Sequence, residues 1–182
     1  MAHLQGFLPP YINGRFVEQS KPDSIFYTRN PMKPNDVLAS AGWNKGLLEP
    51  LISGMKSKQR GYSLVPLEDR IKLINKLIGH LRSNADEIKS NMMLELSRSR
   101  ITVENEWSLC EQLFSFLPNY CRMHLEKKND ETGFEWYYAP LGFILISANV
   151  SLPMYSLLSS ALPALIAGNA VCIRPSSHSM LS

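Results

Sequence analysis

Apolar side chains recur at intervals of three and four through the middle of the chain, which is the spacing of an amphipathic helix. The clearest run lies between residues 67 and 81, and a second helix is expected to begin at a cap formed by Ser83 or Asn84. A third helix is predicted from about Val103 to Arg122, with a disturbance at Pro118. The inward positions of the first two helices are Leu67, Ile71, Ile74, Leu77, Ile78 and Leu81, then Ile88, Met92 and Leu96.

Residues 1–40 show no long periodic run. Their prolines argue against long elements, so only short strands are predicted there, over Tyr11 to Phe16 and Ile25 to Thr28. A further strand is predicted from Gly133 to Ala139, where aromatic side chains are dense. The prolines of the first segment are Pro9, Pro10, Pro22, Pro31 and Pro34.

The last forty residues read as strand, helix and strand. Phe143 to Ile146 is apolar on both faces, as in a parallel strand covered on both sides, and Ala170 to Ile173 is a second such run. Two parallel strands joined by a helix form one βαβ crossover, which predicts an α/β fold. Ligands of open α/β sheets bind at the carboxyl ends of the strands. The small polar residues at 147–151 and the Arg-Pro-Ser at 174–176 therefore lie where a site is expected.

The connecting helix is predicted from Met154 to Ile166, with a kink at Pro163. Ser151 is expected to cap its amino terminus, with Pro153 in the first turn, where a missing N–H does no harm. Gly168 is placed to end the helix in a left-handed conformation.

Composition narrows the class of protein. Apolar residues make up 45% of the chain, charged residues 19%, and the net charge is +3, all typical of a soluble globular chain. The basic residues are spread out, so no nucleic-acid surface is predicted. The longest apolar-rich run, Leu152 to Ile166, is too short to span a membrane and contains two prolines. The start of the chain lacks a signal-peptide pattern, so a cytoplasmic location is the default expectation.

The cysteines and histidines show no metal-ligand spacing, and no metal site is predicted. Cys172 falls in a predicted buried strand and is expected in the core. Cys110 and Cys121 fall on predicted helices, and nothing in the sequence places beside them the cation or helix start that lowers a thiol pKa. None of the three is therefore a candidate nucleophile.

The residue types of the strand–helix–strand segment are more informative about function than their spacing is. It has Pro-x-Gly before the first strand, Leu-Pro at the helix start, and Ala-Gly-Asn-x-Val-x-x-basic-Pro-Ser around the second strand. This order resembles the aldehyde dehydrogenase superfamily, and further landmarks follow the family's order along nearly the whole chain. The landmarks are Tyr11 to Gly14 with Phe16 and Val17, Asn30-Pro31, Val65-Pro66 to Glu95 with Arg70, Leu94-Glu95, Glu104 to Trp107, Pro140 to Gly142, Leu152-Pro153 and Ala167 to Ser176.

The resemblance implies a partial Rossmann-like dinucleotide-binding domain. It divides the chain into an amino-terminal arm and helices over residues 1–132, an oligomerisation strand over 133–140, and a truncated first βαβ unit over 141–182. Family members are more than twice as long, and their nucleophilic cysteine and glutamate base lie beyond the basic-Pro-Ser motif. The chain is therefore expected to be the amino-terminal portion of a longer enzyme and to be inactive alone.

The longer enzyme is expected to oxidise an aldehyde to an acid with NAD or NADP, through a thiohemiacetal on a cysteine absent here, and to form a homo-oligomer. The alternative is a non-catalytic fragment that acts as a structural or interaction module. The Gly133 to Ala139 strand either pairs between subunits, as in the family, or forms a hairpin that packs on its own domain. Landmarks outside the βαβ unit disfavour an unrelated Rossmann-type binding protein.

Ser151 stands at the position where the family has an asparagine that helps to hold the developing oxyanion. Asn149 is the alternative donor and requires a rebuilt turn. The departure from asparagine also fits a divergent branch that handles acyl-CoA or acyl phosphate, or an inactive protein. A plain helix cap is the structural alternative for Ser151.

Arg174 occupies the place of the family's lysine that reaches the adenosine ribose, and Ser177 the place of a glutamate that many NAD-preferring members use. The arginine fork suits a 2′-phosphate, so this pair favours tolerance of NADP or a preference for it. A surface cation is the alternative for Arg174. Ser176 is expected to cap a following helix. Ile146 and Ser147 lie at the strand end where the family lays the cofactor backbone.

Overall fold

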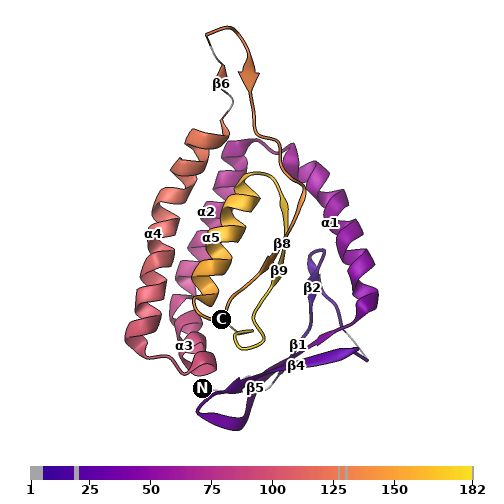
Figure 1. The fold of residues 1–182 in the computed structure, drawn as a ribbon, viewed down its shortest axis with the longest axis vertical. Coiled ribbons are helices and arrows are strands. Elements are labelled where there is room, and N and C mark those ends of the chain that lie inside the picture. Colours follow the sequence, from indigo (N-terminus) through magenta and orange to yellow (C-terminus); the bar gives the residue numbers. More distant parts are fainter. Residues whose placement is uncertain (1–5, 19–20, 127, 130, 182) are drawn as a thin grey trace.

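The computed structural model describes the chain except for residues 1–5, 19–20, 127, 130 and 182. A small sheet from the start of the chain lies at one end, helices flank a two-stranded parallel sheet in the middle, and a hairpin projects from the other end (Figure 1). The strands are β1 (Gly6–Leu8), β2 (Tyr11–Ile12), β3 (Arg15–Phe16), β4 (Ser24–Asn30), β5 (Lys33–Trp43), β6 (Lys128–Asn129), β7 (Glu135–Trp136), β8 (Phe143–Ser147) and β9 (Ala170–Arg174). The helices are the 3-10 helix η1 (Lys45–Leu47) and α1 (Leu48–Ser63), α2 (Leu67–Ser83), α3 (Ala85–Leu96), α4 (Arg100–Leu125) and α5 (Pro153–Ile166).

The first sheet has the order β1-β5-β4, with β1 parallel and β4 antiparallel to β5. The expectation of only short elements in this part of the chain was wrong, because β5 is 11 residues long. Its Pro34 lies where the pairing shifts from Asn30↔Lys33 to Arg29↔Val37. A proline is tolerated at such an irregularity, since its missing N–H removes no ladder hydrogen bond.

The predicted strand from Tyr11 to Phe16 is a two-stranded hairpin, β2–β3. Asn13 and Gly14 form its turn, and both have positive φ angles, of 54° and 85°. Asparagine followed by glycine is the pair that accepts this left-handed geometry most readily in a two-residue hairpin.

The three helices predicted in the middle of the chain are confirmed as α2, α3 and α4. α2 buries Ile71, Ile74 and Ile78 as expected, whereas Leu77 is exposed. Asn84 precedes α3 but does not cap it through its side chain, because its amide Nδ2 donates to the carbonyl of His80 at 2.8 Å. The side chain therefore closes the end of α2 and leaves the start of α3 without the predicted cap.

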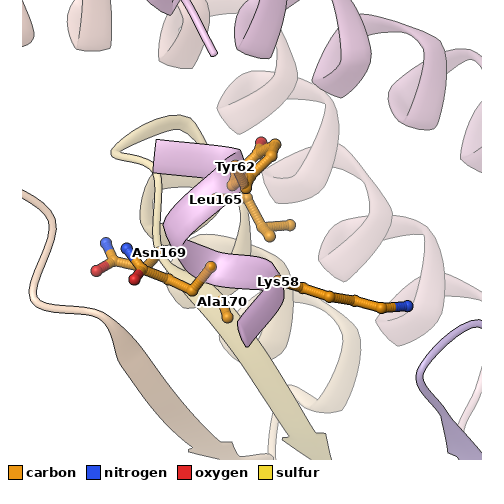
Figure 2. Close-up of a pocket in the computed structure, with 6 residues that line it drawn as sticks. Lys58, Tyr62, Leu165, Asn169 and Ala170 are labelled. Carbon is orange, nitrogen blue, oxygen red and sulfur yellow. The ribbon is translucent and has the colours of Figure 1, made fainter. Parts of the chain in front are cut away.

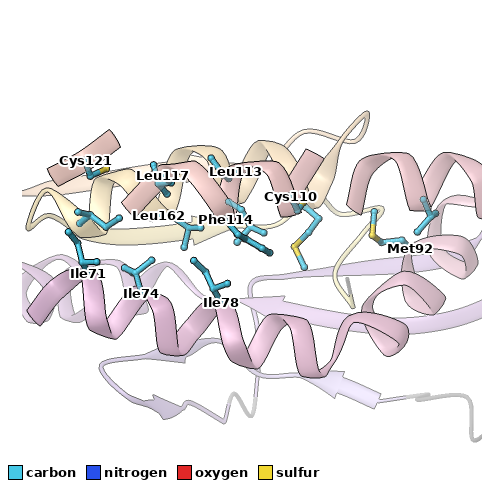
Figure 3. Packing of buried hydrophobic residues seen from close by; sticks show 14 residues of the cluster. Ile71, Ile74, Ile78, Met92, Cys110, Leu113, Phe114, Leu117, Cys121 and Leu162 are labelled. Atoms are coloured by element: carbon cyan, nitrogen blue, oxygen red, sulfur yellow. The ribbon is translucent and has the colours of Figure 1, made fainter. Parts of the chain in front are cut away.

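α4 runs without interruption through Pro118, so the predicted disturbance does not break it. Its apolar face packs against α2 and α5, and Figure 3 shows Leu162 of α5 between side chains of the two other helices. The buried cluster consists of Ile71, Ile74, Ile78, Met92, Val103, Cys110, Leu113, Phe114, Leu117, Cys121, Met154, Leu158, Leu162 and Ile166.

β8 and β9 are parallel and in register from Phe143↔Ala170 to Ser147↔Arg174, which confirms the predicted strand–helix–strand unit. Both α5 and α1 contact the two strands, but Leu145 of β8 is 61% exposed, so this strand is less covered than predicted. α5 ends as predicted at Gly168, whose φ is +90°. The N–H groups of Gly168 and Asn169 donate to the carbonyls of Leu165 and Ala164 at 2.9 and 3.1 Å, the paired bonds of a Schellman motif.

The strand predicted over residues 133–139 is shorter than expected. β7 pairs with β6 as an antiparallel hairpin that projects beyond the helices (Figure 1). Phe134, Trp136, Tyr137 and Tyr138 are all exposed. The hairpin therefore does not bury its aromatic side chains on the body of this chain. Within the part of the chain that the structure describes, no helix has the length and apolar character needed to cross a membrane.

Candidate functional site

The carboxyl ends of β8 and β9 lie side by side, as parallel pairing requires. Ser147 is the register partner of Arg174, and the N–H of Ala148 donates to the Arg174 carbonyl at 2.9 Å. The Nη1 group of Arg174 donates to Oγ of Ser147 at 3.3 Å, and both side chains are exposed. Ile146 is buried and offers no polar side-chain group at this edge. The edge thus presents a cation and a hydroxyl to solvent.

The segment after β9 is a turn and not a helix within the described residues up to 181, which corrects the expectation for Ser176. Ser176 is buried, and its Oγ accepts the N–H of His178 at 3.2 Å. The Ser177 carbonyl accepts from Oγ1 of the buried Thr28 at 3.0 Å. The hydroxyl of Ser176 therefore closes this turn, and Thr28 of β4 binds the turn through the Ser177 carbonyl.

Glu95 and Asn91 of α3 hold the far end of the same turn. The Glu95 side chain is fully buried, and its Oε1 accepts the N–H of Leu181 at 2.7 Å. Nδ2 of Asn91 donates to the Leu181 carbonyl at 3.2 Å. Both backbone groups of one residue are thus bound by α3, which fixes where the chain passes after β9.

The loop between β8 and α5 contains both predicted oxyanion donors, and Asn149 organises it. Its Oδ1 accepts the N–H groups of Ser151 and Leu152 at 2.5 and 3.3 Å. Ser151 is exposed and does not cap α5, because the residue before the helix is Leu152 and makes no side-chain cap. The cap prediction for Ser151 was wrong. Ser151 and Asn149 do lie in one short loop at the carboxyl end of β8.

Glu106 of α4 provides the cap that Ser151 does not. Its Oε1 accepts the N–H groups of Met154 and Tyr155 at 2.9 and 3.1 Å, and Oε2 pairs with Nη1 of Arg98 at 2.8 Å. Nη2 of Arg98 donates to the carbonyls of Val150, at 2.8 Å, and Ser151. A buried ion pair thus holds the loop that carries the candidate donors.

Neither Arg98 nor Glu106 is predicted as a functional residue from the sequence, although the sequence contains a signal for Glu106. Glu106 falls on the apolar stripe of α4 between Val103 and Cys110, at helical spacing. Its side chain is completely buried, at 0% exposure. A carboxylate on a buried stripe must find compensating donors, so such a position indicates a structured polar contact.

The cysteines have thiols that are poorly suited to nucleophilic attack. Burial, followed by the charges of Glu106 and Glu111, raises the pKa of Cys110 to about 12. Burial also raises the pKa of Cys121 and of Cys172. At neutral pH all three are neutral thiols, in agreement with the view that none is the nucleophile. Cys172 is only partly buried, less than the core position expected for it.

A separate hollow of about 310 Å³ lies between α1 and the end of α5 (Figure 2). The amide groups of Gln59 and Asn169 are already engaged there: Gln59 donates to the Gly168 carbonyl at 3.2 Å, and Asn169 bonds both the Gly142 N–H and the Ala164 carbonyl. It lies at the amino end of β9, opposite the edge where ligands of such sheets bind. The lining residues are Lys58, Gln59, Tyr62, Leu165, Asn169 and Ala170. Among the described residues, no three His, Cys, Asp or Glu side chains gather as a metal-binding group.

The comparison with protein families settles the class of this fold. The model of the "Aldehyde dehydrogenase family" matches residues 16–182. The chain belongs to the aldehyde dehydrogenase family. The strand edge described above therefore belongs to a partial domain of the aldehyde dehydrogenase fold, which confirms the family and the fold that the resemblance predicted.

Solved structures of aldehyde dehydrogenases share the fold. A 1-pyrroline-5-carboxylate dehydrogenase from Thermus with bound NAD has a TM-score of 0.86 and 16% identity, over 96% of this chain and 34% of that one. An NAD-dependent benzaldehyde dehydrogenase from Corynebacterium glutamicum has a TM-score of 0.79 and 21% identity, over 94% and 38%. Lactaldehyde dehydrogenase from Escherichia coli has a TM-score of 0.79 and 18% identity, over 97% and 38%.

The chain thus spans little more than a third of the length of these structures. No curated protein matches its sequence significantly.

Proposed function

We propose that the protein containing this chain is an NAD(P)-dependent oxidoreductase that oxidises an aldehyde to an acid through a thiohemiacetal on a cysteine outside these 182 residues. The observation that carries the proposal is the paired carboxyl edge of β8 and β9 in a chain of the aldehyde dehydrogenase family. Polar donors gather at the strand ends, where open α/β sheets bind their ligands. The structurally similar dehydrogenase with bound NAD and the NAD-dependent benzaldehyde dehydrogenase support the cofactor class.

The residues at this edge fit the adenosine half of a dinucleotide. Arg174 presents its guanidinium to solvent beside the hydroxyl of Ser147, and Ser177 follows three residues later without a carboxylate. A guanidinium suits phosphate oxygens, and hydroxyl groups suit a ribose. We infer that Arg174 and Ser177 admit a 2′-phosphate, so that NADP binds at least as well as NAD. When bound, the nicotinamide of the dinucleotide accepts hydride.

For the oxyanion, we propose that Ser151 donates its hydroxyl, with the Asn149 amide as the alternative. Both lie in the loop after β8. The side-chain oxygen Oδ1 of Asn149 accepts the hydrogen bonds of the turn, whereas its Nδ2 group can donate to a ligand. Two variants separate them. S151A removes the hydroxyl, whereas N149D keeps the acceptor that holds the turn and removes the donor. A donor to the oxyanion is worth about a hundredfold in kcat, so the variant that loses this much identifies the group.

The activity test uses the protein at its native length, a panel of aliphatic and aromatic aldehydes, and NAD or NADP. Formation of the reduced cofactor, followed by its ultraviolet absorbance and matched by acid product, is the expected result. The 182-residue chain alone is the control and is expected to be inactive. Absence of turnover with every aldehyde and both cofactors would contradict the proposal.

A second candidate role is an interaction module, because the β6–β7 hairpin projects with exposed aromatic side chains (Figure 1). We propose that residues 133–140 pair with the same segment or a sheet edge of another copy, which makes the protein a homo-oligomer. Exposed aromatic groups beside an open strand edge favour such pairing. Light scattering of W136S/Y138S is expected to show a smaller assembly than the wild type. The control L64S changes another exposed apolar side chain and is expected to leave the assembly intact.

A further inference from the structure

The amino terminus of α5 has its free backbone donors satisfied from outside the helix. The first N–H groups of a helix have no partner within it, and a side chain just before the helix normally accepts the second and third. Pro153 has no N–H, and those of Met154 and Tyr155 go to Oε1 of Glu106, which lies 48 residues earlier than Met154. The position of α5 is thereby tied to α4 through one carboxylate.

Arg98 connects this carboxylate to the loop that precedes the helix. Its guanidinium reaches Glu106 with Nη1 and the carbonyls of Val150 and Ser151 with Nη2. The N–H of Ser151 is held by Asn149. Both backbone groups of Ser151 are therefore fixed, one by Arg98 and the other by the turn. Only the exposed Ser151 side chain is left to face a ligand.

We propose that Arg98 and Glu106 are positioning residues that hold the Ser151 loop in the one shape from which it can stabilise the oxyanion. Neither touches a substrate, since the Glu106 side chain is 0% and the Arg98 side chain 16% exposed. A preorganised donor needs a backbone that does not move as charge develops. The expected effect of this pair on catalysis rests on the proposed function. The statement that the pair fixes the loop rests on the contacts alone.

The negative charge of Glu106 and the forked guanidinium group of Arg98 are both required for this geometry. A lysine at position 98 carries one ammonium group and cannot reproduce the planar fork that reaches a carboxylate and two carbonyls together. A glutamine at position 106 keeps the shape and one acceptor oxygen but removes the charge opposite Arg98. R98K and E106Q therefore weaken the hold on the loop without emptying the space between α4 and α5.

The experiment compares R98K and E106Q with R100K and E104Q in the protein at its native length. The two controls change neighbouring residues whose side chains are 84% and 43% exposed, and Glu104 pairs with both Arg100 and Lys89. Hydrogen exchange measured by mass spectrometry reports on the peptide covering 149–156 and, as an internal reference, on α2. Steady-state kinetics give kcat and KM for the aldehyde, and titration gives Kd for the cofactor.

R98K and E106Q are expected to speed exchange in the 149–156 peptide by about tenfold, because each weakens hydrogen bonds to a charged group. Exchange in α2 is expected to stay unchanged. Activity is expected to fall through kcat, by up to about a hundredfold, with KM and Kd near the wild type, since a misplaced group acts on the transition state. The controls are expected to match the wild type in every measurement.

Exchange in the 149–156 peptide that matches the controls overturns the proposal. So does faster exchange throughout the protein, which would show a general structural role, and so does faster local exchange with unchanged kcat. Failure of R98K to fold leaves the shape-conserving E106Q to decide. A wild type without aldehyde oxidation rejects the proposed function, and with it the catalytic consequence, while the exchange data still decide whether the pair holds the loop.

Discussion

The loop after β8 and the turn after β9 leave the same edge of one sheet, yet they are held in different ways. The loop is held by a buried ion pair that binds two of its backbone carbonyls and caps α5 through two N–H groups. The turn is held through neutral hydroxyl and amide groups and one carboxylate, and its Arg174 side chain extends into solvent. At one edge of the sheet, the structure thus combines a fixed backbone with exposed side chains. Under the proposed function, the held loop suits an oxyanion donor that must not move, and the exposed Arg174 suits recognition of a cofactor.

The largest effect on stability is expected where the loop is held. E106A leaves the Arg98 guanidinium buried without its carboxylate and two N–H groups of α5 without an acceptor. Removal of one partner of a buried pair costs about 3 to 5 kcal/mol in free energy of unfolding. Urea unfolding of the native-length protein measures the loss. E104A, on the same helix but at the surface, is expected to lose less than about 1 kcal/mol. Equal losses in the two variants would remove the distinction between the buried pair and a surface one.

A smaller loss is expected at the entry to β9. Gly168 has φ +90°, and a Cβ there would lie 2.0 Å from Nη1 of Arg70. G168A is expected to lower the free energy of unfolding by about 1 to 3 kcal/mol, because a side chain is strained in that conformation. The control is G79A in α2, where a Cβ meets nothing within 4 Å. It is expected to gain about 1 kcal/mol from helix propensity. A G168A protein as stable as the wild type would show that the turn can be rebuilt at no cost.

The hydrogen bond between Thr28 and the turn after β9 can be tested separately. T28V replaces the buried hydroxyl that donates to the Ser177 carbonyl by a methyl group of similar size. Loss of this single neutral hydrogen bond is expected to cost about 1 kcal/mol. T102V, which removes an exposed hydroxyl that contacts Ser99, is expected to stay within about 0.5 kcal/mol of the wild type. Thermal unfolding of both variants beside E106A ranks the loop after β8 against the turn after β9. A loss from T28V as large as that from E106A would contradict the ranking.

Spacing along the chain was enough to predict α2, the β8–α5–β9 unit and the left-handed Gly168, because each depends on neighbouring residues. The sequence does not predict β5, because Pro34 indicates a break in regular structure, whereas in the fold it lies at an irregular pairing that needs no N–H. The cap of α5 was assigned to the nearest serine, Ser151. Its true acceptor is Glu106, which only the tertiary fold brings to the helix, although its place on an apolar stripe hinted at such a partner.

The smallest effect on stability is expected at Arg174, and there the comparison becomes functional. R174A removes an exposed side chain that makes a hydrogen bond to Ser147, so the free energy of unfolding is expected to change by less than about 0.5 kcal/mol. If Arg174 meets the 2′-phosphate, loss of this charged hydrogen bond weakens NADP binding by about tenfold or more and NAD binding by less. Calorimetric titration of both cofactors into R174A, with R100A as the matched surface control, measures the difference. An equal loss for NAD and NADP would place Arg174 away from the 2′ position, and no loss for either would leave it a surface cation. Either result would show that Arg174 does not select between the two cofactors. The contacts of the buried Arg98–Glu106 pair with the β8 loop would not be affected by either result.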